Sequence, residues 1–209
     1  MRYTIPEFIL PATDIIVFDI DGVINKNLAA KVASSAYVSR VLSNVPGFKR
    51  VAIEALQLWE LLLGIRYDIH EFDVLVSKVR GYGISHVGIV TERSLLGVRT
   101  IFRDKDYILQ RMNFVQMRKG FFSKKQERIR GVDIWETESM KPHESVLYRL
   151  TDFAKGKGIK PGRVLIIEDD PGFRFTARSL GFRTYPDETE AIPSRKTDMP
   201  ARHPQIALT

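Results

Sequence analysis

Three short runs of apolar residues, each ending in polar residues, constrain the fold of this chain more than any other feature of its sequence. They extend from Ile15 to Phe18, from Val87 to Val90 and from Val164 to Ile167. Apolar runs without polar alternation are typical of strands buried on both faces, as parallel sheets require. Open parallel sheets place their ligand sites at the carboxyl ends of the strands. We therefore expect an α/β fold in which the polar residues after the three runs meet.

The segments between these runs favour helices. Apolar residues recur at helical spacing from Val146 to Ala154, after Pro142 and before the stop signal of Gly156. After the third run, a helix is expected to end near Gly181, and a strand is expected at 182–185. The alternation predicts a Rossmann-like parallel sheet with helices on both faces, formed by residues 1–25 and 81–190.

Residues 26–80 show a different pattern. Apolar residues recur there at steps of three and four from Phe48 to Leu63, with no convincing strand. We interpret this segment as a small helical cap inserted after the first strand, with ordinary crossover helices of the same domain as the alternative. Residues 191–209 contain three prolines among polar residues, which predicts an irregular C-terminal tail.

Composition excludes several classes of function. The chain has 209 residues, 44% of them hydrophobic, and no cysteine, so it is able to bury a core but not to form disulfides or thiolate sites. The four histidines show no paired spacing, which argues against a zinc site. A phosphate-binding glycine loop and a dinucleotide fingerprint are also missing from the sequence, so no organic cofactor is expected. With no signal peptide and no apolar stretch of about 18 residues, a cytoplasmic location is expected.

The stretch from Ile16 to Val23 delivers two carboxylates, Asp19 and Asp21, after an apolar run and before Gly22. An aspartate at the end of a rigid strand is able to attack phosphorus and form an aspartyl phosphate. A second aspartate is able to protonate the leaving oxygen and then to deprotonate water. The alternative is a surface turn that closes a hairpin, but no matching alternating strand follows.

Three acidic residues in a row, Glu168, Asp169 and Asp170, follow the third apolar run. Such crowding is costly unless a cation binds. Carboxylate oxygens without cysteine or clustered histidine favour Mg²⁺, which takes one or two protein carboxylates beside a substrate phosphate. The sequence thus predicts a Mg²⁺ site here. For Asp170, an acidic helix start is the alternative.

With these motifs, the sequence resembles the haloacid dehalogenase superfamily of aspartate-nucleophile phosphotransferases, whose first motif closely matches Phe18 to Ile24. The resemblance implies that the Thr91 hydroxyl binds the transferring phosphoryl group. It also implies that Lys141 pairs with the nucleophile and with phosphate charge. Arg93 is a further candidate for a phosphate contact. Taken singly, these residues have ordinary alternatives, namely a helix cap, a surface lysine and a solvated helix charge.

The same resemblance implies a set of metal ligands. Asp169 is the leading ligand, joined by Asp19 and by the backbone carbonyl of Asp21. Glu168 or Asp170 is expected close to the ion, in support of these ligands.

The acidic stretch departs from the commonest pattern of the superfamily. A further aspartate usually follows three or four residues later, where this chain has Phe173 and Arg174. The pair Glu168-Asp169 instead resembles the variant found in beta-phosphoglucomutase-like members. The exact set of metal ligands is therefore left undecided.

A basic segment carries most of the net charge of +7. From Arg103 to Arg130, nine Lys or Arg face three Asp or Glu, which gives +6. Aromatic residues such as Tyr107 and Phe114 are interleaved with these cations, as in a nucleic-acid groove or a channel for an anionic substrate. A solvated exposed face has the same composition.

Three functions are consistent with these residues. The favoured one is a Mg²⁺-dependent phosphatase of a small phosphorylated metabolite, with no membrane partner. The second is a phosphomutase or phosphotransferase that uses the same aspartyl phosphate. The third, not favoured, is a nucleic-acid-binding protein or polynucleotide-end phosphatase that uses residues 103–130. The sequence names neither the substrate nor the oligomeric state.

Overall fold

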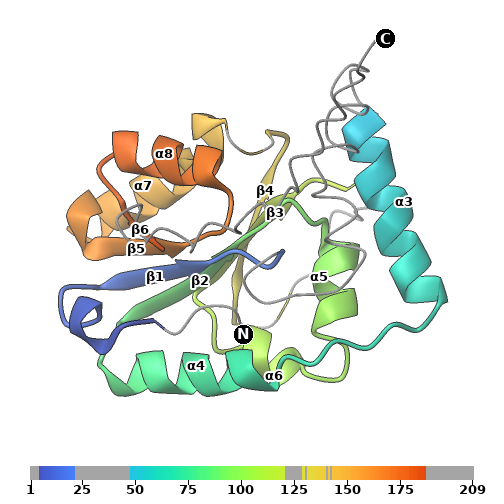
Figure 1. The fold of residues 1–209 in the computed structure, drawn as a ribbon, viewed down its shortest axis with the longest axis horizontal. Coiled ribbons are helices and arrows are strands. Elements are labelled where there is room, and N and C mark those ends of the chain that lie inside the picture. The colour runs from blue at the N-terminus through green and yellow to red at the C-terminus, as the bar shows by residue number, and fades with distance from the viewer. Residues whose placement is uncertain are drawn as a thin grey trace, which may run out of the picture.

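A computed structural model describes residues 5–21, 48–120, 129, 131–139, 141 and 143–186 of the chain. Its centre is a six-stranded sheet with the strand order β4-β3-β2-β1-β5-β6 (Figure 1). Every neighbouring pair of strands is parallel. The strands are β1 (Ile15–Phe18), β2 (His86–Val90), β3 (Phe114–Arg118), β4 (Asp133–Thr137), β5 (Val164–Ile167) and β6 (Arg183–Tyr185). The predicted α/β class with a Rossmann-like parallel sheet is confirmed.

Helices cover both faces of the sheet, as predicted (Figure 1). Side chains of β1 alternate between two hydrophobic clusters, with Ile16 and Phe18 in one and Ile15 and Val17 in the other. The first cluster includes side chains of α4 (His70–Gly81), α5 (Leu95–Ile101) and α6 (Asp106–Leu109). The second includes side chains of the 3-10 helix η2 (Glu144–Leu147), α7 (Tyr148–Gly156) and α8 (Pro171–Ser179). Two further 3-10 turns are η1 (Glu7–Ile9) and η3 (Pro161–Arg163).

None of the helices in the described ranges is both long enough and apolar enough to cross a lipid bilayer.

The three apolar runs of the sequence form β1, β2 and β5, and the strand expected at 182–185 is β6. The strands β3 and β4 are not among the predicted elements. β3 lies inside the basic segment, yet all five of its residues are buried, including the polar Gln116 and Arg118. Residues 114–118 are therefore a core strand, and not part of a solvated charged face. β4 is an edge strand with mostly half-buried or exposed residues, so its apolar pattern is weak.

Gly88 on β2 allows an aromatic cluster to form over the sheet. A β-carbon at this position would lie 2.2 Å from the ring of Phe114, which is too close for any side chain. The Phe114 ring stacks on Trp135 of β4, with ring centroids 4.2 Å apart. The missing side chain of Gly88 thus gives the neighbouring strand room for the ring of Phe114.

The segment predicted as a cap contains two described helices. α4 packs on the sheet through Phe72, Val76 and Val79, none of them more than 2% exposed. It lies as a crossover helix of the sheet, which was the alternative for this segment. The other helix, α3 (Phe48–Leu62), lies at the side of the sheet next to α5 (Figure 1). Residues 22–47 and 187–209 lie outside the described residues, so the cap and the irregular tail stay predictions.

Candidate active site

Three site residues follow directly after strands of the sheet: Asp19 after β1, Thr91 after β2 and Glu168 after β5. The backbone N–H of each donates to a carbonyl of a neighbouring strand, over 3.0, 2.9 and 3.0 Å respectively. Their exposed fractions are 4%, 3% and 1%. The sheet therefore fixes the backbone of all three residues at one edge, where parallel-sheet proteins bind their ligands.

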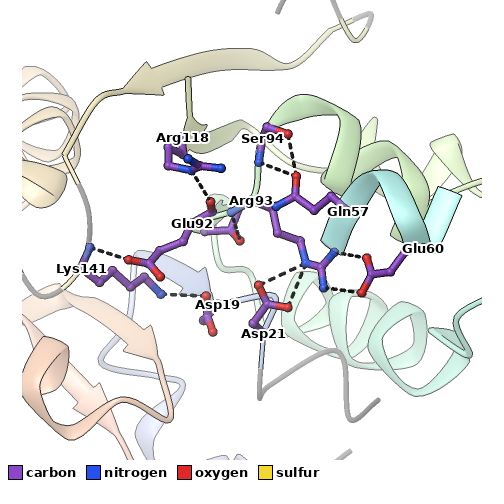
Figure 2. Close-up of polar contacts among 10 residues, drawn as sticks. Asp19, Asp21, Gln57, Glu60, Glu92, Arg93, Ser94, Arg118 and Lys141 are labelled. Carbon is purple, nitrogen blue, oxygen red and sulfur yellow. Dashed lines mark hydrogen bonds and ion pairs between the residues drawn. The ribbon is translucent and has the colours of Figure 1, made fainter. Parts of the chain in front are cut away.

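Lys141 lies at this edge and binds Asp19 (Figure 2) and Glu168. Its Nζ donates to Asp19 Oδ1 over 2.7 Å and also to the Glu168 carboxylate, and it lies 4.7 Å from the centre of the Phe173 ring. The backbone N–H of Lys141 donates to Glu92 Oε1 over 2.9 Å, which helps to fix the position of Lys141 at this edge. The lysine side chain is only 7% exposed, so Lys141 is not a surface residue.

The charges at this edge do not balance. Burial favours the neutral amine of Lys141, but Asp19 and Glu168 reverse this effect and raise its pKa above the usual range. Burial raises the pKa of Asp19 well above its ordinary value, and the charge of Glu168 raises it further against the opposing effect of Lys141. Burial also raises the pKa of Asp169 and brings that of Glu168 to about 6. The single positive charge of Lys141 therefore does not neutralise the negative charges of three carboxylates.

The three carboxylates are placed to hold a cation. Asp19, Glu168 and Asp169 each offer an oxygen, and these oxygens all lie within 4.8 Å of one another. Mg²⁺ binds oxygen at 2.0–2.1 Å, so opposite ligands are about 4.2 Å apart. Small side-chain movements would therefore complete a site for a hard divalent cation, and a cation would relieve the repulsion that raises the pKa values of these acids.

Asp170 and Arg174 shape the acidic loop from α8. The Asp170 carboxylate accepts a hydrogen bond of 2.8 Å from the Phe173 N–H and caps α8, which is the alternative role considered for this residue. Arg174 donates to the backbone carbonyls of Glu168 and Asp169 over 3.0 and 2.9 Å. Arg174 was not a predicted site residue, although it stands where the family that the sequence resembles usually has an aspartate.

Asp21 and Arg93 form a second group beside the first (Figure 2). Arg93 Nε donates to Asp21 Oδ1 and Oδ2 over 2.9 and 3.1 Å, and its NH1 donates to Glu60 Oε2 over 2.6 Å. Burial alone would lower the pKa of Arg93, but Asp21 and Glu60 raise it, so the guanidinium stays charged. The Arg93 side chain is 3% exposed and so is not a solvated helix charge.

Thr91 does not cap a helix, because the residue before α5 is Ser94. The Thr91 hydroxyl accepts a hydrogen bond of 3.1 Å from the Arg93 N–H. Thr91 and Arg93 are thus held together within one buried loop at the end of β2, beside Asp19 and Asp21. A phosphate contact from either residue stays a prediction.

Helix α3 contributes residues that the sequence analysis did not identify. Glu54 Oε1 accepts a hydrogen bond of 2.8 Å from Arg118 NH2, and Gln57 Oε1 accepts one of 2.6 Å from the Ser94 hydroxyl. Arg118 Nε also donates to the carbonyl of Glu92 over 3.0 Å. The spacing of 54, 57 and 60 places three polar residues on one helix face, but nothing in the sequence indicates that this face is buried.

Comparison with known proteins identifies the fold. No family model matches the chain, and no curated protein matches it. Among solved structures, a CbbY variant from Rhodobacter sphaeroides in complex with xylulose-(1,5)bisphosphate aligns with a TM-score of 0.50 at 16% identity, over 82% of this chain and 84% of that chain. CbbY in complex with phosphate gives 0.50 at 17% identity over the same shares. A wild-type HAD family enzyme from Bacteroides thetaiotaomicron, in complex with magnesium and inorganic phosphate, gives 0.45 at 13% identity over 83% and 93%. At these identities, the two CbbY structures establish a shared fold.

Proposed function

We propose that this chain, which has the fold of the HAD-like hydrolases, is a Mg²⁺-dependent phosphatase that removes phosphate from a small phosphorylated metabolite. The observation that carries the proposal is the buried contact of Lys141 Nζ with Asp19 Oδ1, 2.7 Å long, at the edge where three carboxylates converge. A lone buried acid–lysine pair would be a structural ion pair. The additional carboxylates create a site that needs a further cation, as phosphoryl transfer does.

In the first step, the Asp19 carboxylate attacks phosphorus and forms an aspartyl phosphate, while the bond from phosphorus to the ester oxygen breaks. Asp21 gives its proton to that oxygen, so the leaving group departs as a neutral alcohol. Lys141 stabilises the negative charge on the phosphoryl oxygens, because burial strengthens the attraction of its ammonium group. Attack needs ionised Asp19, and Lys141 favours that form.

In the second step, Asp21 takes a proton from water as the water oxygen attacks the aspartyl phosphate. The bond between phosphorus and Asp19 breaks, which releases inorganic phosphate and restores both aspartates to their starting forms. Asp19, Glu168 and Asp169 would hold Mg²⁺, with Asp21 joining through its backbone carbonyl. When bound, the ion neutralises phosphate charge. The Thr91 hydroxyl is proposed to bind the phosphoryl group.

The shared fold supports the substrate class. The two CbbY structures hold a sugar bisphosphate and a phosphate, and a small phosphate ester is what the Asp19 and Lys141 edge would bind. The buried state of Arg118 removes one cation of the basic segment from a nucleic-acid surface. A small phosphorylated metabolite is therefore the substrate we propose.

The test is a phosphatase screen over phosphorylated metabolites, with and without Mg²⁺, beside the variant Asp19→Asn. The amide has nearly the same shape as the carboxylate but is a poor nucleophile, so we expect turnover to fall by a factor on the order of 10³ or more. Circular dichroism should show an unchanged fold. A variant as active as the wild type would remove Asp19 from the mechanism and overturn the proposal.

A further inference from the structure

Helix α3 turns polar residues toward the sheet and apolar residues away from it. Glu54, Gln57 and Glu60 are 6%, 1% and 0% exposed, whereas Trp59 and Leu62 are 62% and 75% exposed. A helix held by the hydrophobic effect would show the reverse arrangement. α3 is therefore held in place by specific polar contacts.

These contacts differ in the further contacts that the partner residues make. Glu54 binds Arg118, and Gln57 binds Ser94. Glu60 binds Arg93, whose guanidinium also holds the carboxylate of Asp21. Of the three contacts, the one from Glu60 leads directly to the side chain that we assign to proton transfer (Figure 2).

The geometry of Arg93 couples the two acids that it binds. A guanidinium group is planar, and its donors have fixed directions. Arg93 uses Nε for both oxygens of Asp21, and NH1 and NH2 for Glu60 over 2.6 and 3.3 Å. Because the Arg93 and Glu60 side chains are only 3% and 1% exposed, the pair has little freedom to rotate. The position of Glu60 thus sets the direction in which Nε points at Asp21.

We propose that Glu60 is a positioning residue for the reaction, acting through Arg93 to place the Asp21 carboxylate for proton transfer. The inference rests on the proposed phosphatase function. It adds that Glu60 of α3 takes part in catalysis through its contact with Arg93. General acid catalysis typically contributes about 10²- to 10⁴-fold, and the contribution is largest when the leaving oxygen is strongly basic.

This dependence on the leaving group gives the test. An alkyl phosphate needs a proton on its leaving oxygen, whereas 4-nitrophenyl phosphate releases a stable anion and needs none. Glu60→Gln keeps the shape of the side chain and removes its charge. We expect kcat for the alkyl phosphate to fall about 10-fold or more, and kcat for the aryl phosphate to change less than about 3-fold.

Glu54→Gln is the matched control. It makes the same chemical change on the same buried helix face and removes the charge from the contact with Arg118, which is 2.8 Å long. If both acids only attach α3 to the sheet, the two variants will lower the rates of both esters by similar factors. Our proposal requires that Glu60→Gln alone discriminate between the esters. Arg93→Lys, which keeps the charge but cannot hold both acids, should behave like Glu60→Gln and serves if that variant does not fold.

The outcomes distinguish a failure of the proposed function from a failure of the positioning role of Glu60. A wild type that, with Mg²⁺, hydrolyses neither 4-nitrophenyl phosphate nor any alkyl phosphate of the metabolite screen overturns the proposed function, and with it this inference. A wild type active on both, with equal losses for both esters in Glu60→Gln, overturns the positioning role alone. A crystal structure of Glu60→Gln gives a readout that does not depend on activity. Asp21 should lose its two-oxygen contact with Arg93 Nε, and an unchanged contact would refute the coupling.

Discussion

The buried carboxylate of Glu168 contributes less to the stability of the metal-free protein at neutral pH than in mild acid. Burial raises its pKa from 4.5 to about 6, even though Lys141 opposes this shift. The charged form is therefore disfavoured in the folded state. Glutamine has the shape of the protonated acid and carries no charge at any pH. We predict that Glu168→Gln stabilises the metal-free protein at pH 7.

The size of the effect follows from linkage. A difference of about 1.5 in pKa corresponds to about 2 kcal/mol of unfolding free energy. In the unfolded chain Glu168 loses its proton near pH 4.5, but in the folded protein only near pH 6. Its contribution to stability is complete below pH 4.5 and is lost as the pH rises through 6. For a chain of this size, about 2 kcal/mol shifts the melting temperature by about 4–8 °C.

The measurement is a series of thermal melts from pH 4 to 7.5 in EDTA. The wild type and Glu168→Gln should melt together near pH 4, and the variant should be the more stable above pH 6. Glu138→Gln is the control, because the Glu138 side chain is 73% exposed and forms an ion pair with Lys119, which is itself 53% exposed. Its melting curve should follow that of the wild type. A Glu168→Gln variant that is no more stable than the wild type at pH 7 would refute the reasoning.

Two further predictions concern the cation and the sheet. Mg²⁺ at about 100 times its dissociation constant should stabilise the wild type by about 2.7 kcal/mol, and Asp169→Asn should lose most of this shift in a thermal melt. An equal shift in the variant would exclude Asp169 as a ligand. Gly88→Ala places a β-carbon 2.2 Å from the Phe114 ring and should destabilise the protein by about 1–3 kcal/mol, with altered Trp135 fluorescence. Gly162→Ala, where a β-carbon would have open space, should change urea unfolding little, and equal effects of the two alanines would contradict the role of Gly88.

The central strands and the acids that follow them could be predicted from the sequence, because both signals are local. An uninterrupted run such as Ile15 to Phe18 is rare outside buried strands, and Asp19 and Glu168 follow such runs directly. The parallel order of the strands then brings these acids together. The contact between Lys141 and Asp19 spans 122 positions of sequence and was expected only through the resemblance to a family.

The contacts of α3 could not be predicted, because they depend on which face of a helix is buried. Periodicity identifies α3 as a helix and indicates Trp59 and Leu62 as its inner residues, whereas the structure buries Glu54 and Glu60. These acids are buried because Arg118 and Arg93 compensate their charges, and each arginine lies more than thirty positions away. The strand β3 was missed for a related reason, since buried Gln116 and Arg118 interrupt its apolar pattern.

The strand order has a consequence for how the protein is made. Of the six strands in the described residues, β1 is translated first, but it lies in the middle of the sheet, between β2 and β5, and β5 ends only at Ile167. During synthesis, Asp19 therefore lacks its neighbour Glu168 until almost 150 further residues have been translated. A truncated chain that stops before β5 has half of the cation site, so tight Mg²⁺ binding should appear only when the last central strand has docked.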